Sequence, residues 1–64
     1  MKKELFRGME IMQKNESGTA FVCYSQFDMG DKYKIYTRRN GDAARFYMSF
    51  GTIGEAYKIL KKIP

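Results

Sequence analysis

The dipeptide Asn40-Gly41 restricts the possible folds of this chain more than any other feature of its sequence. Asn and Gly both tolerate a positive φ angle, which a two-residue type I′ turn requires at its two central positions. The dipeptide therefore predicts a tight β-hairpin, and counting outward from the turn assigns the residues that face each other across the strands. The predicted pairs are Arg38 with Ala43, Tyr36 with Arg45, Ile35 with Phe46, Lys34 with Tyr47, and Tyr33 with Met48.

This register divides the hairpin into an apolar face and a basic face, because directly opposed residues point to the same side of a sheet. It places Phe46 in the core and leaves Tyr36 exposed. We expect the apolar face to be buried and the basic face to be open. The apolar face carries Tyr33, Ile35, Phe46, Met48 and Phe50, and the basic face carries Lys34, Tyr36, Arg38, Arg45, Tyr47 and Ser49.

A helix is predicted over residues 53–63, directly after the hairpin. Thr52 suits the N-cap position, and Glu55 three residues later completes the capping-box pattern Thr-x-x-Glu. Apolar residues then recur at helical spacing, while lysines occupy the opposite side and the last turn. We expect the apolar stripe to lie across the apolar face of the hairpin. The stripe consists of Ile53, Ala56, Leu60 and Ile63.

Residues 19–27 have the composition and alternation of a further strand. The segment 28–30 is typical of a three-residue loop with Gly30 in a left-handed conformation, and counting through it sets the register with the next strand. Tyr24 then falls on the basic face. The side chains expected to face the core are Phe21, Cys23 and Phe27, and the expected pairs are Val22 with Tyr36, Tyr24 with Lys34, and Gln26 with Lys32.

Residues 5–14 fit two secondary structures. Leu5, Met9 and Met12 have helical spacing, but the segment also fits a strand that Gly8 interrupts, and we favour the strand. The turn-forming cluster at residues 15–18 would then join it to residues 19–27 as a hairpin. In that arrangement residues 5–14 could shield the basic face or pair with a second copy of the chain.

These segments predict a single α+β domain within the 64 residues. The domain is predicted to be a three- or four-stranded antiparallel meander with one helix on one face, in which residues 19–50 form the β-meander and residues 53–63 the helix. Residues 1–18 supply an N-terminal strand or helix and a turn. A domain of this size buries roughly 60% of its unfolded surface, so we expect modest stability.

The residue types offer little basis for catalysis. The chain has no histidine and a single cysteine, Cys23, so we expect neither a metal site nor a nucleophile activated by an imidazole. We therefore expect a protein that is not an enzyme and needs no cofactor. A lone cysteine forms no internal disulfide, and the sequence has no signal-peptide pattern or membrane-spanning run. A reducing, cytoplasmic location fits these features best.

The charge and aromatic content of the basic face indicate a binding function. Lys and Arg total 12 against 7 Asp and Glu, a net charge of +5, and nucleic acid is the commonest partner of such chains. Aromatic rings stack on bases, cations neutralise phosphates, and a short sheet can enter the major groove. We predict a small accessory or regulatory protein that binds nucleic acid, DNA before RNA and duplex DNA in particular. The predicted binding residues are Tyr24, Lys34, Tyr36, Arg38, Arg39, Arg45 and Tyr47.

The same face also fits a protein partner. Tyr and Arg are frequent hot-spot residues of interfaces, and methionines add adaptable apolar surface. The alternative is a small interaction module, such as an inhibitor or adaptor of the kind that phages and mobile elements encode. A homodimer is a further alternative, and no membrane partner is expected.

Residues 19–63 resemble the DNA-binding domains of plant ethylene-response factors and the arm-binding domains of tyrosine integrases. Three strands precede a helix, and Phe50-Gly51-Thr52-Ile53-Gly54-Glu55-Ala56 is similar to the aromatic-x-Thr-x-x-Glu-Ala helix start of those families. The resemblance implies that the open sheet face lies in the major groove. The chain departs from the pattern in having no tryptophan and more tyrosine on that face. The resemblance assigns the groove contacts to Lys34, Tyr36, Arg38, Arg45 and Tyr47.

Overall fold

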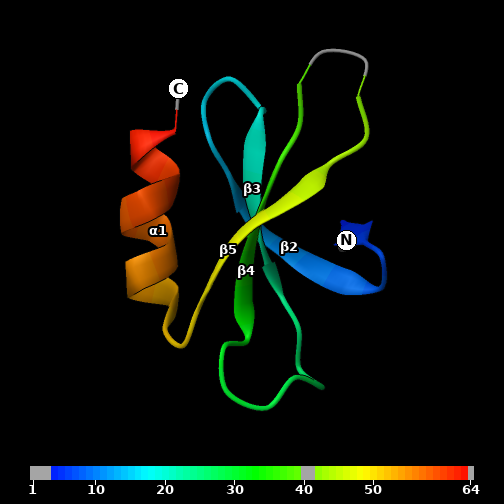
Figure 1. Ribbon diagram of the computed structural model, residues 1–64, viewed down its shortest axis with the longest axis vertical. Helices are drawn as coiled ribbons and strands as arrows, with labels where there is room; N and C mark the ends of the chain where they lie inside the picture. The colour runs from blue at the N-terminus through cyan, green and yellow to red at the C-terminus, as the bar shows by residue number, and fades with distance from the viewer. Residues whose placement is uncertain (1–3, 40–41, 64) are drawn as a thin grey trace.

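The computed structural model describes residues 4–39 and 42–63 and contains one antiparallel sheet with a C-terminal helix against it (Figure 1). The five strands lie in sequence order, so every neighbouring pair is an antiparallel connection. This confirms the α+β class with one helix on one face, although the sheet has five strands where three or four were predicted. The elements are β1 (Leu5–Phe6), β2 (Met9–Lys14), β3 (Ala20–Tyr24), β4 (Tyr33–Thr37), β5 (Arg45–Phe50) and α1 (Ile53–Lys62).

The additional strand arises from a tight turn inside residues 5–14. Arg7 and Gly8 both have positive φ angles, 51° and 80°, which is the requirement of a two-residue hairpin turn with primed geometry. Phe6 pairs with Met9 across this turn. The strand prediction for this segment is confirmed and the helical alternative is wrong, because the turn divides the segment into β1 and β2.

Helix α1 begins where the capping pattern predicts. The Thr52 hydroxyl accepts a hydrogen bond from the Glu55 amide at 3.4 Å. Ala56 and Leu60 are buried against one face of the sheet, and Ile63 packs beside them, as the predicted stripe requires. The sheet residues buried beneath the helix are Ala20, Val22 and Ile35.

Asn15 ties the β2–β3 loop to both its own hairpin and the end of the helix. Its side-chain oxygen accepts from the Ala20 amide at 3.1 Å, and its Nδ2 donates to the Ile63 carbonyl at 3.2 Å. The predicted hairpin through residues 15–18 is therefore present, and one polar side chain links it to the C-terminal turn. Within the described residues, no helix has the length and apolar character needed to cross a membrane.

The register between β3 and β4 differs from the prediction by one residue. Val22 pairs with Ile35 rather than with Tyr36. A shift of one residue moves every side chain of a strand to the other face. The cause is the loop, which spans residues 25–32 and is closed by a hydrogen bond from the Ser25 amide to the Lys32 carbonyl at 2.8 Å. Gly30 does adopt the predicted positive φ, at 96°.

The placements of four side chains differ from the prediction. Phe21 and Cys23 are buried, as predicted, but on the face that the helix does not cover. Tyr24 lies on the helix side, where its ring is 5.3 Å from that of Tyr33. Phe27, predicted to face the core, lies in the loop and is 88% exposed.

The register between β4 and β5 also changes along its length. The turn at Asn40-Gly41 lies outside the described residues, although the Asp42 amide donates to the Arg39 carbonyl across it at 3.0 Å. Tyr36 pairs with Phe46, whereas Ile35 pairs with Met48, and Tyr47 is the extra residue of a β-bulge between them.

The bulge explains why the predicted faces of β5 hold at one end and fail at the other. The pairing of Met48 and Phe50 with β4 is shifted by two residues from the prediction, so both side chains stay on their predicted face. The pairing of Phe46 with β4 is shifted by only one residue from the prediction, so its side chain lies on the face away from the helix. Phe46 is therefore 56% exposed rather than part of the core. Arg45 moves the opposite way: it pairs with Thr37, on the helix side of the sheet.

Candidate functional site

Three aromatic side chains form a row across the face of the sheet that the helix leaves uncovered. Phe21, Tyr36 and Phe46 occupy directly paired positions on β3, β4 and β5. The Phe21 and Tyr36 rings are nearly parallel with centroids 6.1 Å apart, and Phe46 meets Tyr36 at 75° with centroids 5.9 Å apart. Edge-to-face and offset pairs of this kind are favourable arrangements for aromatic rings.

The β1–β2 hairpin covers two members of this row and leaves the third open. The Phe6 ring lies 5.0 Å from Phe21 and 4.9 Å from Tyr36, measured between centroids. Consequently Phe21 and Tyr36 are only 5% and 7% exposed, while Phe46 at the edge strand is half exposed. The sequence suggested that residues 5–14 shield this face or pair with a second copy of the chain. In the structure they shield it, through Phe6.

Two arginines lie beside the part of the row that Phe6 covers. The Arg7 guanidinium is 5.0 Å from the centroid of Phe6 and 5.7 Å from that of Tyr36, within the range of cation–π attraction. Arg38 follows β4 and, with Arg7, Phe6 and Phe21, lines a shallow cleft of about 410 Å³. We call Arg7, Arg38 and Phe46 the arginine–aromatic surface.

The lysines on this face differ from the arginines because each has a carboxylate partner. Lys14 pairs with Glu4 at 2.6 Å, and Lys34 pairs with Asp28. The hydrogen bond from Lys34 lowers the pKa of Asp28 and raises that of Lys34, so both stay charged at neutral pH. Within residues 4–39 and 42–63, no such ion pair involves the arginines Arg7, Arg38, Arg39 and Arg45.

The predicted binding residues therefore do not form one surface. Tyr36 is buried beneath Phe6, and Lys34 is held by Asp28. Tyr24 and Arg45 belong to the helix side of the sheet, which corrects their predicted place on the basic face. Arg38, Arg39 and Tyr47 remain exposed, and of these Arg38 lines the cleft.

Two members of the arginine–aromatic surface were absent from the sequence prediction. Arg7 could have been predicted as a surface residue, because Arg7-Gly8 between Phe6 and Met9 suggests a two-residue hairpin turn, whose side chains are exposed. Phe46 carried no such signal. Its exposure depends on the one-residue shift of register between β4 and β5.

The cysteine on this face is buried and protonated. Cys23 is fully buried, and burial raises the pKa of its thiol to about 11, so at neutral pH it is protonated. Among the described residues, no three potential metal-ligating side chains come together.

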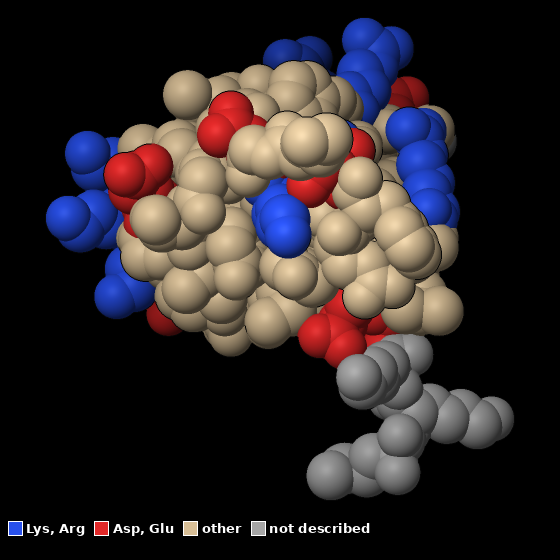
Figure 2. Space-filling model, turned by 90° about the horizontal axis from the view of Figure 1, so that it is seen from below, with Lys and Arg blue, Asp and Glu red and all other residues tan. Residues whose placement is uncertain are grey.

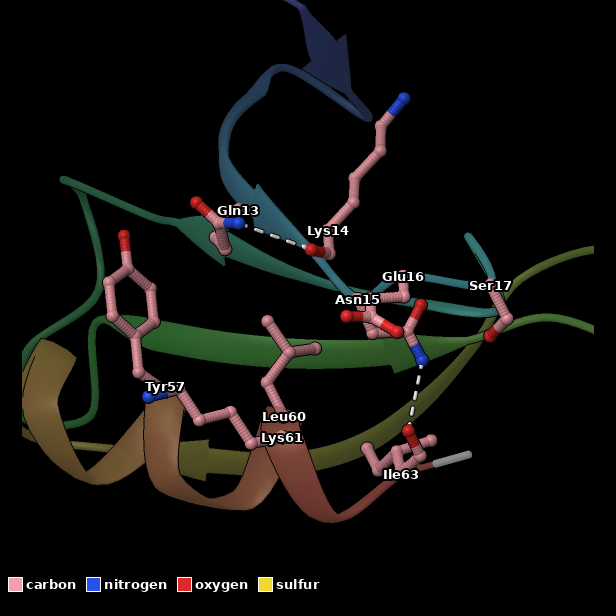
Figure 3. Close-up of a pocket in the computed structure, with 9 residues that line it drawn as sticks. All are labelled: Gln13, Lys14, Asn15, Glu16, Ser17, Tyr57, Leu60, Lys61 and Ile63. Carbon is pink, nitrogen blue, oxygen red and sulfur yellow. Dashed lines mark hydrogen bonds between the residues drawn. The ribbon is translucent and has the colours of Figure 1, made fainter.

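A second hollow lies on the helix side. Because α1 packs over β3, β4 and β5, a groove of about 610 Å³ remains between the helix and the β2–β3 loop. Figure 3 shows Tyr57, Leu60 and Ile63 along the helix side of this groove and residues 13–17 on its other side, with the Lys14 side chain pointing away from the helix. Its charged members are Lys14, Glu16 and Lys61.

The end of the molecule that carries the 25–32 loop exposes large apolar side chains. Phe27 and Met29 are 88% and 98% exposed, and the ion pair of Lys34 with Asp28 holds the loop between them against the sheet. Figure 2 views the molecule from this end and shows a largely uncharged middle, with most lysine and arginine side chains at its margins.

Comparison of the chain with protein-family models, with curated protein sequences and with solved structures gives no match. Any functional proposal therefore depends on the residues of the chain itself. The arginine–aromatic surface combines two arginines that have no ion-pair partner among the described residues with a half-exposed ring on the sheet.

Proposed function

We propose that this protein binds nucleic acid through the arginine–aromatic surface, as a small accessory or regulatory protein. The observation that carries the proposal is the arrangement around Tyr36. Arg7 and Arg38 have no ion-pair partner among the described residues. The Arg7 guanidinium lies 5.7 Å from the centroid of Tyr36, against which the half-exposed ring of Phe46 packs, and Arg38 lines the same cleft as Arg7. Arginine neutralises phosphates with release of counter-ions, and an exposed aromatic ring stacks on bases.

The charge of the whole chain supports the same conclusion. A net charge of +5 on 64 residues attracts polyanions over distances comparable to the Debye length. Arg39 is exposed and follows Arg38 in the chain, so it would add a phosphate contact at the rim of the surface. The buried, protonated Cys23 suits a reducing cytoplasmic setting, where DNA and RNA are both accessible.

A second candidate function, binding of a protein partner, is favoured by one feature. Phe27 and Met29 are nearly fully exposed on a loop that an ion pair holds in place, which is typical of an apolar contact at an interface. Binding through this loop would depend little on salt, whereas binding through arginines would depend on it strongly.

The proposal is tested by fluorescence anisotropy of labelled DNA at increasing salt. If three or four arginines each neutralise one phosphate, affinity falls about 20- to 150-fold between 50 and 200 mM salt. The variant Arg7→Asn with Arg38→Gln should bind more weakly and should flatten the log–log salt slope by about 1.5. Asparagine suits the positive φ at position 7.

The matched control is Lys58→Gln with Lys62→Gln, which removes the same charge from the exposed side of α1. This control should lose only the part of the affinity that reflects net charge. If the wild-type protein fails to bind DNA at low salt, or if both double variants weaken binding equally, the proposal is wrong.

A further inference from the structure

We infer that the nucleic acid bound by the arginine–aromatic surface is single-stranded, with one base stacked on Phe46. The inference rests on the proposed function and specifies its ligand. It follows from which side chains on this face are free to make contacts, and from how the exposed ring is held.

Two central side chains that would read a duplex groove, Tyr36 and Lys34, are not free. For the open sheet face to enter the major groove, polar side chains at its centre must reach base edges. Here Tyr36 is buried beneath the Phe6 ring, and the Lys34 ammonium is bound to Asp28. The β1–β2 hairpin also stands over the centre of the face, so this face offers no broad surface to a duplex.

Phe46, in contrast, is placed as a stacking platform. Half of its surface is exposed, and its ring is fixed at 75° against the buried ring of Tyr36. A ring held by a packed neighbour loses little conformational freedom when a base stacks on it. Because β5 is the edge strand of the sheet, one side of Phe46 has no neighbouring strand to cover it.

Arg7 is close enough to Phe46 to contact the backbone of the same strand. The Arg7 guanidinium lies 5.7 Å and the Phe46 centroid 5.9 Å from the centroid of Tyr36, so the two are at most about 12 Å apart. A short length of extended single strand can therefore place a base on Phe46 and a phosphate at Arg7. A base paired within a duplex exposes only its edge and cannot stack in this way.

The experiment compares a single-stranded oligonucleotide with the duplex of the same sequence, by anisotropy, for wild-type protein and three variants. Phe46→Ala should weaken single-strand binding about 5- to 150-fold and affect duplex binding much less. Phe27→Ala removes an equally large, more exposed ring elsewhere and should change neither affinity. Phe46→Trp should retain single-strand binding.

The tryptophan variant adds a direct readout, because the natural chain contains no tryptophan. In the Phe46→Trp protein, stacking of a base on the introduced indole should quench its fluorescence when single-stranded DNA is added, and duplex should quench it less. Circular dichroism confirms that each variant is folded, which we expect because position 46 is half exposed.

The outcomes separate the inference from the function on which it rests. Equal or tighter binding of duplex, or equal effects of Phe46→Ala and Phe27→Ala, would overturn the single-strand inference while leaving nucleic-acid binding intact. Absence of binding to both oligonucleotides at low salt would instead overturn the proposed function.

Discussion

Replacing Tyr36 by alanine is expected to destabilise the domain by about 3–5 kcal/mol. The ring is buried at the centre of the face that the helix leaves uncovered, where it contacts Phe6, Phe21 and Phe46. Its removal would leave a cavity beneath the β1–β2 hairpin. A domain of 64 residues has a total stability of about 3–10 kcal/mol, so this variant should be largely unfolded or close to it.

The matched control is Phe46→Ala, for which we expect a loss of about 1 kcal/mol, the value of one aromatic pair. Urea unfolding followed by far-ultraviolet circular dichroism measures both variants. The register derived from the sequence implies the reverse order, with Phe46 in the core and Tyr36 on the surface. If Phe46→Ala proves the more damaging change, the observed strand pairing of β4 with β5 is wrong.

Replacing Leu60 by alanine is expected to cost about 2–5 kcal/mol. Leu60 is the largest buried side chain of α1, and it packs on Ala20, Val22 and Ile35. The helix is only 10 residues long, which is too short to be stable in water without this contact. The variant should therefore lose helical signal at lower urea concentrations than the wild-type protein.

Lys58→Ala is the control for this change, since it alters an exposed residue of the same helix and keeps a high helix propensity. Its free energy of unfolding should lie within about 0.5 kcal/mol of the wild-type value. A Leu60→Ala protein as stable as the Lys58→Ala protein would show that the helix does not depend on the sheet.

The local elements could be predicted from the sequence because their signals are local. Thr52 and Glu55 mark the start of the helix, and the cluster at residues 15–18 marks a hairpin. Each signal involves residues within a few positions of one another, where backbone preference and short hydrogen bonds decide the structure.

Strand register could not be predicted equally well, because it depends on single residues in loops and bulges. The longer 25–32 loop moved β3 by one position, and the bulge at Tyr47 changed the register within β5. A shift of one residue reverses the faces of a strand while preserving its alternation of polar and apolar residues. The alternation of polar and apolar residues is thus equally consistent with either register, and so with either face of the strand being buried.

The candidate site was predicted only in part for the same reason. Arg38 and Arg39 belong to a turn and are exposed in any register. Phe46 and Tyr36 exchange core and surface when the register changes, and burial of Tyr36 also needs Phe6, which is far away in the chain. Contacts of that range leave no periodicity in the sequence.

We propose that nucleic acid binds at the arginine–aromatic surface. The most direct measurement follows the amide NMR signals of isotope-labelled protein while an unlabelled single-stranded oligonucleotide is added. The largest shifts should occur at Arg7, Arg38 and Phe46, and those at Phe27 and Lys58 should be small. Shifts concentrated in helix α1 or in the 25–32 loop would contradict the claim and place the binding site on another face.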